Sequence, residues 1–370
     1  MKILQVAEAV HPSFGGIAEG IYQQGIELRA LGHKVDAASG DSEIVERLCQ
    51  GGSRHFAFPP SHRQWRWSRE LKQWMAAHVG DYDVIVLNGL WMGPMYEAAR
   101  SARRAKIPYV VMPHGMLDPY FLTTAKQRVI KRLYWALVEG RIARGARGLF
   151  FTAQAEEEKA RSSYPLDGIR SWQVGYGIKD PERSDALPKC DDGEDSLLFM
   201  SRIHPKKGLD VTIQALIKTA SGPSLDVCGD GDSEYVEALK SLAAPLGSKV
   251  RWHGFTSGEE KWQRIEGCDA MILTSHQENF GVIVAEAMSL GRPVLISREV
   301  NIWREIEQDQ AGIVCEAEPE SAAKMIQEFQ GLSAVQRHEM GQRARRAFLN
   351  RYTIQKSVAR FEVALKEVVQ

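Results

Sequence analysis

Two glutamates, Glu278 and Glu286, lie eight positions apart around the expected start of a helix. A strand-like apolar run at 270–275 precedes them, and the small-residue segment 282–290 has a helical pattern. At about 1.5 Å per residue the two positions are at most roughly 12 Å apart, which is about the distance from the sugar to the ribose of a nucleotide sugar. Carboxylates accept hydrogen bonds from hydroxyls, so this pair can hold both ends of a polyhydroxylated ligand. Glutamates that face solvent on an amphipathic helix are the alternative.

The segment between the two glutamates leads into the expected helix N-terminus. Unpaired N–H groups and the helix dipole at such an end favour a phosphate or diphosphate. Gly281 lets the backbone approach a ligand closely. The candidate donor-binding residues of this segment are Asn279, Phe280, Gly281 and Val282.

A basic pair lies upstream, where Arg202 and Lys207 follow the apolar run 197–200 and precede a helical pattern at 211–218. This places both residues on a loop at the carboxyl end of a strand, the edge at which open α/β sheets bind ligands. Arginine offers a planar fork to phosphate oxygens, and lysine offers a mobile point charge. We therefore expect a phosphate-binding loop here.

Taken together, these motifs resemble the signature of the family-4 retaining glycosyltransferases of the GT-B fold, also called glycosyl transferases group 1. The resemblance is carried by Arg202 with Lys207, Glu278 with Glu286, and the N-terminal pair Gly15 and Gly16. It implies an α/β protein with two Rossmann-like, doubly wound parallel-sheet domains that face a central cleft. It also implies a nucleotide-sugar donor, with a UDP-sugar favoured, and a saccharide or lipid-linked saccharide acceptor.

The elements along the chain fit that architecture. Apolar strand-like runs alternate with helical patterns, as in a parallel doubly wound sheet. The pattern restarts after an acidic, turn-rich stretch, so we expect a linker near 178–195. The expected domains are an acceptor-binding domain at 1–180, a nucleotide-sugar-binding domain at 181–350, and a helix at 351–370 that crosses back to the first domain. The expected strands are 3–7, 34–38, 83–87, 109–112, 148–152, 197–200, 224–228, 250–253, 270–274 and 293–297.

Length and composition limit the class of protein. A chain of 370 residues exceeds what one hydrophobic core usually supports, which favours two domains. Five scattered cysteines without a C-x-x-C pattern indicate reduced thiols. Neither a signal-peptide pattern nor an apolar run of about 20 residues is evident, so we expect a cytoplasmic protein, with the inner face of the membrane as an alternative setting. Residues 1–180 contain 24 Lys and Arg against 18 Asp and Glu, which favours an anionic partner for the basic first half.

The resemblance assigns further site residues. His114, in the segment Met112-Pro-His-Gly, takes the place of a histidine that lies over the donor sugar near the reacting centre. Gly254 and Phe255 lie in the loop expected to contact the nucleobase. The backbone of Gly15 and Gly16 would approach donor phosphate or acceptor, with a plain tight turn as the alternative.

Two sequence patterns, one around Gly15 and one at 230–232, argue against a redox cofactor and against a metal site. The glycines around Gly15 do not have G-x-G-x-x-G spacing, so dinucleotide binding is not expected. Asp230 and Asp232 have the Asp-x-Asp spacing of a metal site, but the family carries a glycine turn here, and Arg202 with Lys207 supplies the charge that a cation would bring. We expect no metal and no cofactor.

Two basic, aromatic-rich stretches, 62–74 and 126–147, lie in the first half of the chain. The second has seven Lys and Arg against Glu139 alone, and its apolar positions 129, 130, 133, 134, 137 and 138 form a helical stripe. Tryptophan and tyrosine with basic neighbours suit an anionic membrane interface. A solvated basic face over an ordinary core contact is an equally good interpretation. We expect no nucleic acid partner.

The expected activity is that of a metal-independent hexosyltransferase that retains the anomeric configuration, acting in surface polysaccharide or glycolipid synthesis. His114, Arg202, Lys207 and Glu278 would form its catalytic centre. Two alternatives stay open at this point: a nucleotide-sugar epimerase of the same fold, and a non-catalytic nucleotide-sugar-binding subunit.

Overall fold

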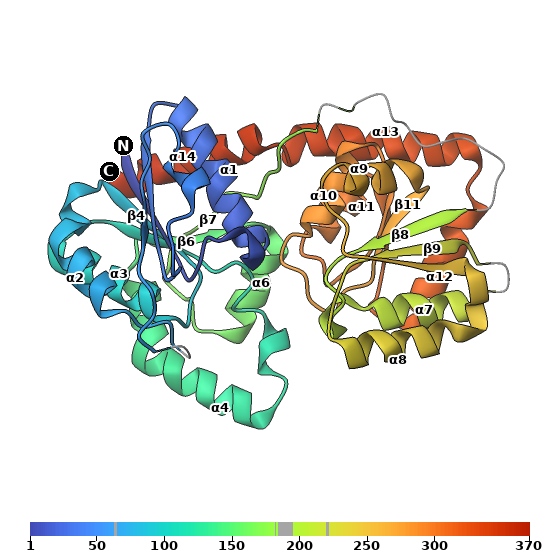
Figure 1. The fold of residues 1–370 in the computed structure, drawn as a ribbon, viewed down its shortest axis with the longest axis horizontal. Helices are drawn as coiled ribbons and strands as arrows, with labels where there is room; N and C mark the ends of the chain where they lie inside the picture. Colours follow the sequence, from blue (N-terminus) through green and yellow to red (C-terminus); the bar gives the residue numbers. More distant parts are fainter. Residues whose placement is uncertain (63–64, 182, 184–194, 220–221) are drawn as a thin grey trace. The chain divides into compact units, whose positions relative to one another are not determined.

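The computed structural model describes residues 1–62, 65–181, 183, 195–219 and 222–370 (Figure 1). The chain divides into two units, one formed by Met1–Lys179 with Ile354–Gln370 and the other by Asp180–Thr353. Most of the expected linker at 178–195, with Cys190, lies outside the described residues.

The first unit is built on a seven-stranded parallel sheet with the order β3-β2-β1-β4-β5-β6-β7. Its strands are β1 Lys2–Ala7, β2 Lys34–Ser39, β3 His55–Ala57, β4 Val84–Asn88, β5 Tyr109–Met112, β6 Gly148–Phe151 and β7 Ser171–Gln173. Its helices are α1 Gly16–Ala30, α2 Arg69–His78, α3 Gly93–Ala105, α4 Ala125–Tyr134, α5 Gly140–Gly145, α6 Gln154–Ser163 and α14 Ile354–Val369. A π-helical segment, Trp135–Glu139, joins α4 to α5.

The second unit is built on a six-stranded parallel sheet with the order β10-β9-β8-β11-β12-β13. Its strands are β8 Ser196–Met200, β9 Ser224–Cys228, β10 Val250–Gly254, β11 Ala270–Leu273, β12 Val294–Ser297 and β13 Gly312–Cys315. Its helices are α7 Leu209–Lys218, α8 Ser233–Ala243, α9 Gly258–Gly267, α10 Val282–Ser289, α11 Trp303–Gln308, α12 Pro319–Gly331 and α13 Ala334–Arg351.

Helices cover both faces of each sheet, and the central strands are accordingly mostly apolar, with a few polar residues such as Gln5 in β1 and Asn88 in β4. Every residue of β4 and of β11 is buried. The closing helix α14 belongs to the first unit, where it lies beside α1 (Figure 1). It contributes Phe361 and Leu365 to the core, and the Phe361 ring lies 5.3 Å from that of Phe150 between centroids.

The fold class expected from the sequence, two doubly wound parallel-sheet units, is confirmed. Three strands, β3, β7 and β13, were not predicted. Each lies at a margin of its sheet and has three or four residues, with residues that are partly exposed. A short strand of this kind lacks the continuous apolar run that identifies a central parallel strand.

Candidate active site

In the second unit the strand order reverses between β8 and β11, because the chain builds outward from β8 in one direction and then starts again at β11. Open α/β sheets bind ligands at such a point, outside the carboxyl ends of the strands. Arg202 and Lys207 lie on the loop after β8, and Glu278 lies on the loop after β11. The predicted charged residues of this unit therefore flank its switch point.

The two loops are fastened to each other through backbone contacts. Gly208 has φ of 66°, and a Cβ at this position would lie 1.9 Å from the carbonyl oxygen of Thr274. The Thr274 hydroxyl donates to the Gly208 carbonyl at 2.6 Å, and the amide of His276 donates to the Lys206 carbonyl at 2.8 Å. Glycine is therefore required for the approach that brings the two loops together.

Lys207 and Glu278 form an ion pair across these loops. Both side chains are largely buried, with 11% and 16% of their surfaces exposed. The main chain holds Glu278 in place, since its amide donates to the Glu299 carbonyl at 3.0 Å and its carbonyl accepts from the Asn301 amide at 3.1 Å. Arg202 is exposed and forms no ion pair within the part of the chain that the structure describes. The loop after β8 thus carries both an exposed guanidinium and, five residues later, a lysine that is already paired with Glu278.

Helix α10 begins at Val282, four residues after Glu278, where the sequence predicted its start. Its N-cap, Gly281, has φ of 77° and ψ of 64°, a left-handed conformation that favours glycine. Phe280 is buried against Tyr352, with ring centroids 5.5 Å apart, and Asn279 Oδ1 accepts from Asn301 Nδ2 at 3.4 Å. The amides of Val284 and Ala285 donate to the Gly281 carbonyl at 2.8 and 3.2 Å, so the first two N–H groups, those of Val282 and Ile283, are the ones without an acceptor inside the helix. They form a positive end beside Lys207 and Glu278.

Glu286 lies further along α10, where its Oε1 is 2.7 Å from Nζ of Lys261. Lys261 comes from α9 and was not predicted as a site residue. No sequence motif marks it, because the contact depends on how α9 and α10 pack. Helices α9 and α10 therefore supply a second Lys–Glu pair to this unit.

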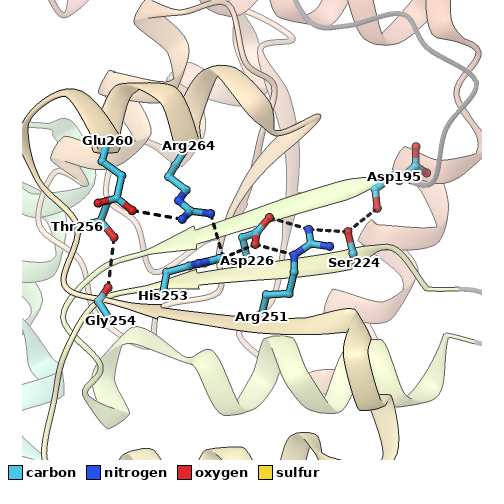
Figure 2. Close-up of polar contacts among 9 residues, drawn as sticks. All are labelled: Asp195, Ser224, Asp226, Arg251, His253, Gly254, Thr256, Glu260 and Arg264. Atoms are coloured by element: carbon cyan, nitrogen blue, oxygen red, sulfur yellow. Dashed lines mark hydrogen bonds and ion pairs between the residues drawn. The ribbon is translucent and has the colours of Figure 1, made fainter.

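The β10–α9 turn carries Gly254 and Phe255. Figure 2 shows the polar cluster that fixes this end of β10, in which Asp226 of β9 accepts from Arg251 at 2.8 and 2.9 Å and also contacts His253. Burial opposes the charge on Asp226, yet these hydrogen bonds hold its pKa below the ordinary value. The Thr256 hydroxyl donates to the Gly254 carbonyl at 3.3 Å, and 72% of Phe255 is exposed. The turn is thus anchored while its aromatic ring stays accessible.

Asp230 and Asp232 of the Asp-x-Asp segment make structural hydrogen bonds at the β9–α8 turn. Asp232 is the N-cap of α8, and its Oδ1 accepts from the Tyr235 amide at 3.1 Å. Asp230 accepts through its carbonyl from the Ile203 amide at 2.8 Å. The second contact joins the β9–α8 turn to the loop that carries Arg202.

In the first unit the strand order reverses between β1 and β4. Gly15 and Gly16 follow β1 and are exposed, and Gly15 has φ of 81°. The Gly16 carbonyl accepts from the Tyr176 hydroxyl at 2.7 Å. The expected glycine pair thus opens α1 at the switch point of its own sheet.

His114 lies just after β5 in the same unit. It has φ of 51°, a left-handed conformation that is uncommon for histidine and is followed by Gly115 with φ of 77°. The partly exposed imidazole is 3.1 Å from Asn88 through Nε2, and burial lowers its pKa from 6.5 to about 4. His114 is therefore a neutral group at pH 7.

Two buried carboxylates, neither predicted, hold the loops around His114. Glu156 accepts from the Gly115 amide and from both the amide and hydroxyl of Thr152, each at 2.7 Å. Glu139 accepts from the amide of Trp91 at 2.9 Å, and Trp91 has φ of 72° in the loop after β4. Burial raises the pKa of Glu139 to about 7. The sequence offered one sign of the buried Glu139, which is the acidic residue at the end of the apolar helical stripe at 129–138.

The basic, aromatic-rich stretches separate into core and surface. Trp135 is buried in the first unit's core and Trp74 packs against Phe56, so these two rings make ordinary core contacts, one of the two interpretations left open for these stretches. Trp65 is 42% exposed and stacks on Tyr134 of α4. No helix within the described residues is long and apolar enough to span a membrane.

Comparison with known proteins matches a glycosyltransferase family model to each unit. The model of the glycosyl transferase 4-like domain matches residues 15–171, and the model of glycosyl transferases group 1 matches residues 182–347.

Individual relatives are distant. An uncharacterized glycosyltransferase of Methanocaldococcus jannaschii is 28% identical over 45% of this chain and 44% of its own length. A D-inositol 3-phosphate glycosyltransferase of Frankia alni is 25% identical over 76% of this chain and 77% of its own. HepE of Anabaena, solved with UDP and glucose, has a TM-score of 0.75 at 17% identity over 99% of both chains, which shows a shared fold. The two matched domains, the paired parallel sheets and this shared architecture place the chain in the group 1 glycosyltransferase family with the GT-B fold.

Proposed function

We propose that this glycosyltransferase moves a hexosyl unit from a nucleotide sugar, with a UDP-sugar favoured, to an acceptor hydroxyl with retention of anomeric configuration. One observation carries the proposal: Arg202, Lys207 and the start of α10 gather with Glu278 around the switch point of the second unit. UDP is favoured because the structural neighbour HepE was solved with that nucleotide and with glucose.

The charges suit the leaving group. As the bond from the anomeric carbon to the donor phosphate breaks, its electron pair passes to the nucleoside diphosphate. Arg202 and Lys207 would stabilise that negative charge, which is electrostatic stabilisation of the transition state. An ammonium has three donors, so Lys207 can keep Glu278 and still donate to phosphate. The acceptor hydroxyl forms the new bond to the anomeric carbon, and its proton passes to the leaving phosphate oxygen.

Each remaining site residue has a role that matches its surroundings. Glu278 would accept from sugar hydroxyls and Glu286 from the ribose, while the backbone from Asn279 to Val282 holds sugar and phosphate. Gly254 and the exposed Phe255 would contact the nucleobase. In the first unit, neutral His114 would contact the donor sugar, and the backbone of Gly15 and Gly16 would approach phosphate or acceptor.

The proposal includes independence of metal ions. The guanidinium, the ammonium and the helix start supply the positive charge that a divalent cation brings in other glycosyltransferases. Asp232 is engaged as a helix cap. We assign surface polysaccharide or glycolipid synthesis as the setting, in accord with the family resemblance.

A direct assay tests the proposal. The purified protein is incubated with UDP-, GDP- and ADP-sugars in EDTA, with and without short saccharide acceptors, and products are followed by NMR from the first turnover. We expect release of one nucleoside diphosphate and a first product with the donor's anomeric configuration. An inverted product contradicts the mechanism, and a new epimer formed without acceptor identifies an epimerase instead.

We also propose that α4 docks on an anionic membrane, so that the site reaches a lipid-linked acceptor. No residue of α4 is buried, and the exposed fractions of Val129, Ile130 and Leu133 are 67%, 54% and 59%. The same helix has no acidic residue, and its basic side chains include Lys126 and Arg128, which form no ion pair with the described residues. Apolar side chains flanked by unpaired cations suit an anionic lipid surface.

Vesicle sedimentation tests this docking. Each basic residue near such a surface contributes about 1 kcal/mol, so binding to phosphatidylserine vesicles should exceed binding to phosphatidylcholine vesicles and weaken as salt rises. Ile130→Ser with Leu133→Ser should reduce sedimentation, whereas Val335→Ser, which alters a 67% exposed apolar residue of α13, should not. Equal sedimentation with neutral and anionic vesicles would exclude the proposed docking.

A further inference from the structure

A chain of amide side chains, buried at Gln5 and Asn88 and partly exposed at Gln24, runs through the first unit and ends at His114. Gln24 of α1 accepts from Gln5 of β1 at 2.7 Å, and Gln5 accepts from Asn88 of β4 at 2.7 Å. Asn88 in turn lies 3.1 Å from Nε2 of His114. Gln5 and Asn88 are 1% and 3% exposed, so water cannot substitute freely for a missing partner.

The main chain fixes which way the Asn88 amide points. Its Nδ2 lies 3.4 Å from the carbonyl oxygens of Val6 and Val86. Both carbonyls accept hydrogen bonds and cannot donate, so the atom that faces them must be the NH₂ group. Turning the amide over would place its oxygen against two carbonyl oxygens in a buried site and leave the NH₂ group without these acceptors, which is unfavourable. Asn88 therefore presents Oδ1 to His114.

From this geometry we propose that Asn88 is a positioning residue that holds His114 as the neutral tautomer protonated on Nε2. Oδ1 accepts, so the imidazole nitrogen that faces it must carry the hydrogen. Nδ1 then keeps its lone pair. His114 lines a pocket of the first unit together with Asn88, Gln24 and Tyr176.

The tautomer limits what His114 can do for a bound sugar, an assignment that rests on the proposed function. With Nε2 committed to Asn88, the imidazole can accept a hydrogen bond from a hydroxyl through Nδ1 but cannot donate through that atom. It also does not supply a positive charge for the leaving diphosphate. The ligand group that it selects is thus a hydroxyl donor.

Nitrogen-15 NMR of the intact protein, labelled at histidine, tests the tautomer directly. The His114 signals are assigned by their loss in His114→Gln. At pH 7 we expect Nε2 with the shift of a protonated nitrogen and Nδ1 with that of an unprotonated one, with this tautomer in roughly tenfold or greater excess. The opposite tautomer, an even mixture of the two, or a doubly protonated ring would overturn the proposal.

Two variants separate positioning from a general effect on the fold. Asn88→Leu removes the acceptor and should let the two tautomers mix. Gln24→Leu removes the far end of the chain and should leave the tautomer unchanged, because the Val6 and Val86 carbonyls still orient Asn88. An unchanged tautomer in a folded Asn88→Leu variant overturns the proposal. If Asn88→Leu does not fold, the spectrum of the unmodified protein still decides.

The NMR result does not depend on turnover, so it can be told apart from the proposed function. A protein that transfers no sugar but shows the Nε2–H tautomer contradicts the proposed function alone. A protein that transfers sugar but shows the Nδ1–H tautomer contradicts the inference alone.

Discussion

The two units present different chemistry at the same topological position. At the β8–β11 switch point of the second unit, charged groups gather: Lys207 pairs with Glu278, and Arg202 has no partner among the described residues. At the β1–β4 switch point of the first unit, the strands contribute the buried amide side chains of Gln5 and Asn88, and neighbouring His114 has its pKa lowered to about 4. The side chains described at the second unit's switch point are charged, whereas Gln5, Asn88 and His114 at the first unit's switch point are uncharged at pH 7.

This contrast shows that topology sets the place of a site and that side chains set what it binds. Parallel strands of both units deliver loops to a switch point, where backbone N–H groups and helix starts are available. The charged edge suits a diphosphate, whereas neutral amides and an imidazole suit uncharged hydroxyls. A nucleotide-sugar donor carries both kinds of group, because its diphosphate is charged and its sugar bears uncharged hydroxyls.

The largest effect is expected from removing positive charge in the second unit. Arg202→Ala or Lys207→Ala should lower kcat by roughly 10²-fold or more, the scale of one lost preorganised stabilising group. Steady-state kinetics with the active donor measures it. Lys240→Ala, which removes an exposed lysine of α8, is the control and should leave kcat unchanged. If folded Arg202→Ala turns over as fast as the unmodified protein, the claim that charge in the second unit stabilises the leaving diphosphate is wrong.

The neutrality of the first unit predicts a pH effect on stability. Glu139 has its pKa raised from 4.5 to about 7 by burial, so the folded state binds the proton more tightly than the unfolded state. Its contribution is therefore fully present below pH 4.5 and is lost as pH rises through 7. Glu139→Gln, which stays neutral, should match the unmodified protein near pH 5 and exceed it by about 2 kcal/mol at pH 8.

Urea unfolding across pH 5–8 measures that difference. Glu43→Gln replaces an exposed glutamate of the same unit and should show no such trend. A Glu139→Gln variant whose advantage is constant with pH would show that Glu139 is already charged in the folded protein.

A smaller effect should separate the two glutamates of the second unit. Glu278→Gln should lower turnover roughly tenfold, because a charged acceptor near the reacting sugar is replaced by a neutral one. Glu286→Gln should lower it less, since that side chain would hold the remote ribose. Glu278→Gln also leaves Lys207 without its ion-pair partner, so affinity for the free nucleoside diphosphate should rise. The reverse ranking of the two variants would contradict the assignment of sugar to Glu278.

The smallest effect is expected at the Asp-x-Asp turn. Asp230→Asn should be nearly silent, and activity should persist in EDTA, because Arg202, Lys207 and the α10 start supply the positive charge. Initial rates with EDTA, Mg²⁺ and Mn²⁺ measure this. Activity that is lost in EDTA and restored by either cation would show that the second unit needs a metal to bind the diphosphate.

The sequence predicted the central strands and the charged loops because each leaves a local pattern. Buried parallel strands read as continuous apolar runs, and Arg202, Lys207, Glu278 and Glu286 follow such runs at short, fixed distances. Lys261 leaves no such pattern, because its contact with Glu286 arises from the packing of two helices.

The first unit was less predictable for the same reason. Gln5, Asn88 and His114 come from three strands or strand ends, and their side chains meet only when β1, β4 and β5 pair. Glutamine and asparagine are common surface residues, so nothing in the sequence marks them as buried. Trp135 lies in the basic stretch 126–147, for which the sequence left a membrane interface and a core contact open, and the structure buries it in the core.

Calorimetric titration tests the central claim most directly, that the β8–β11 switch point binds the nucleoside diphosphate through its own charges. UDP, GDP and ADP are titrated in EDTA into the unmodified protein, Arg202→Ala and Lys240→Ala. We predict that one of the three nucleotides binds without metal, that Arg202→Ala weakens it by tenfold or more, about 1.4 kcal/mol, and that Lys240→Ala binds it normally. Equal affinity in Arg202→Ala, or binding that requires a divalent cation, would contradict the claim.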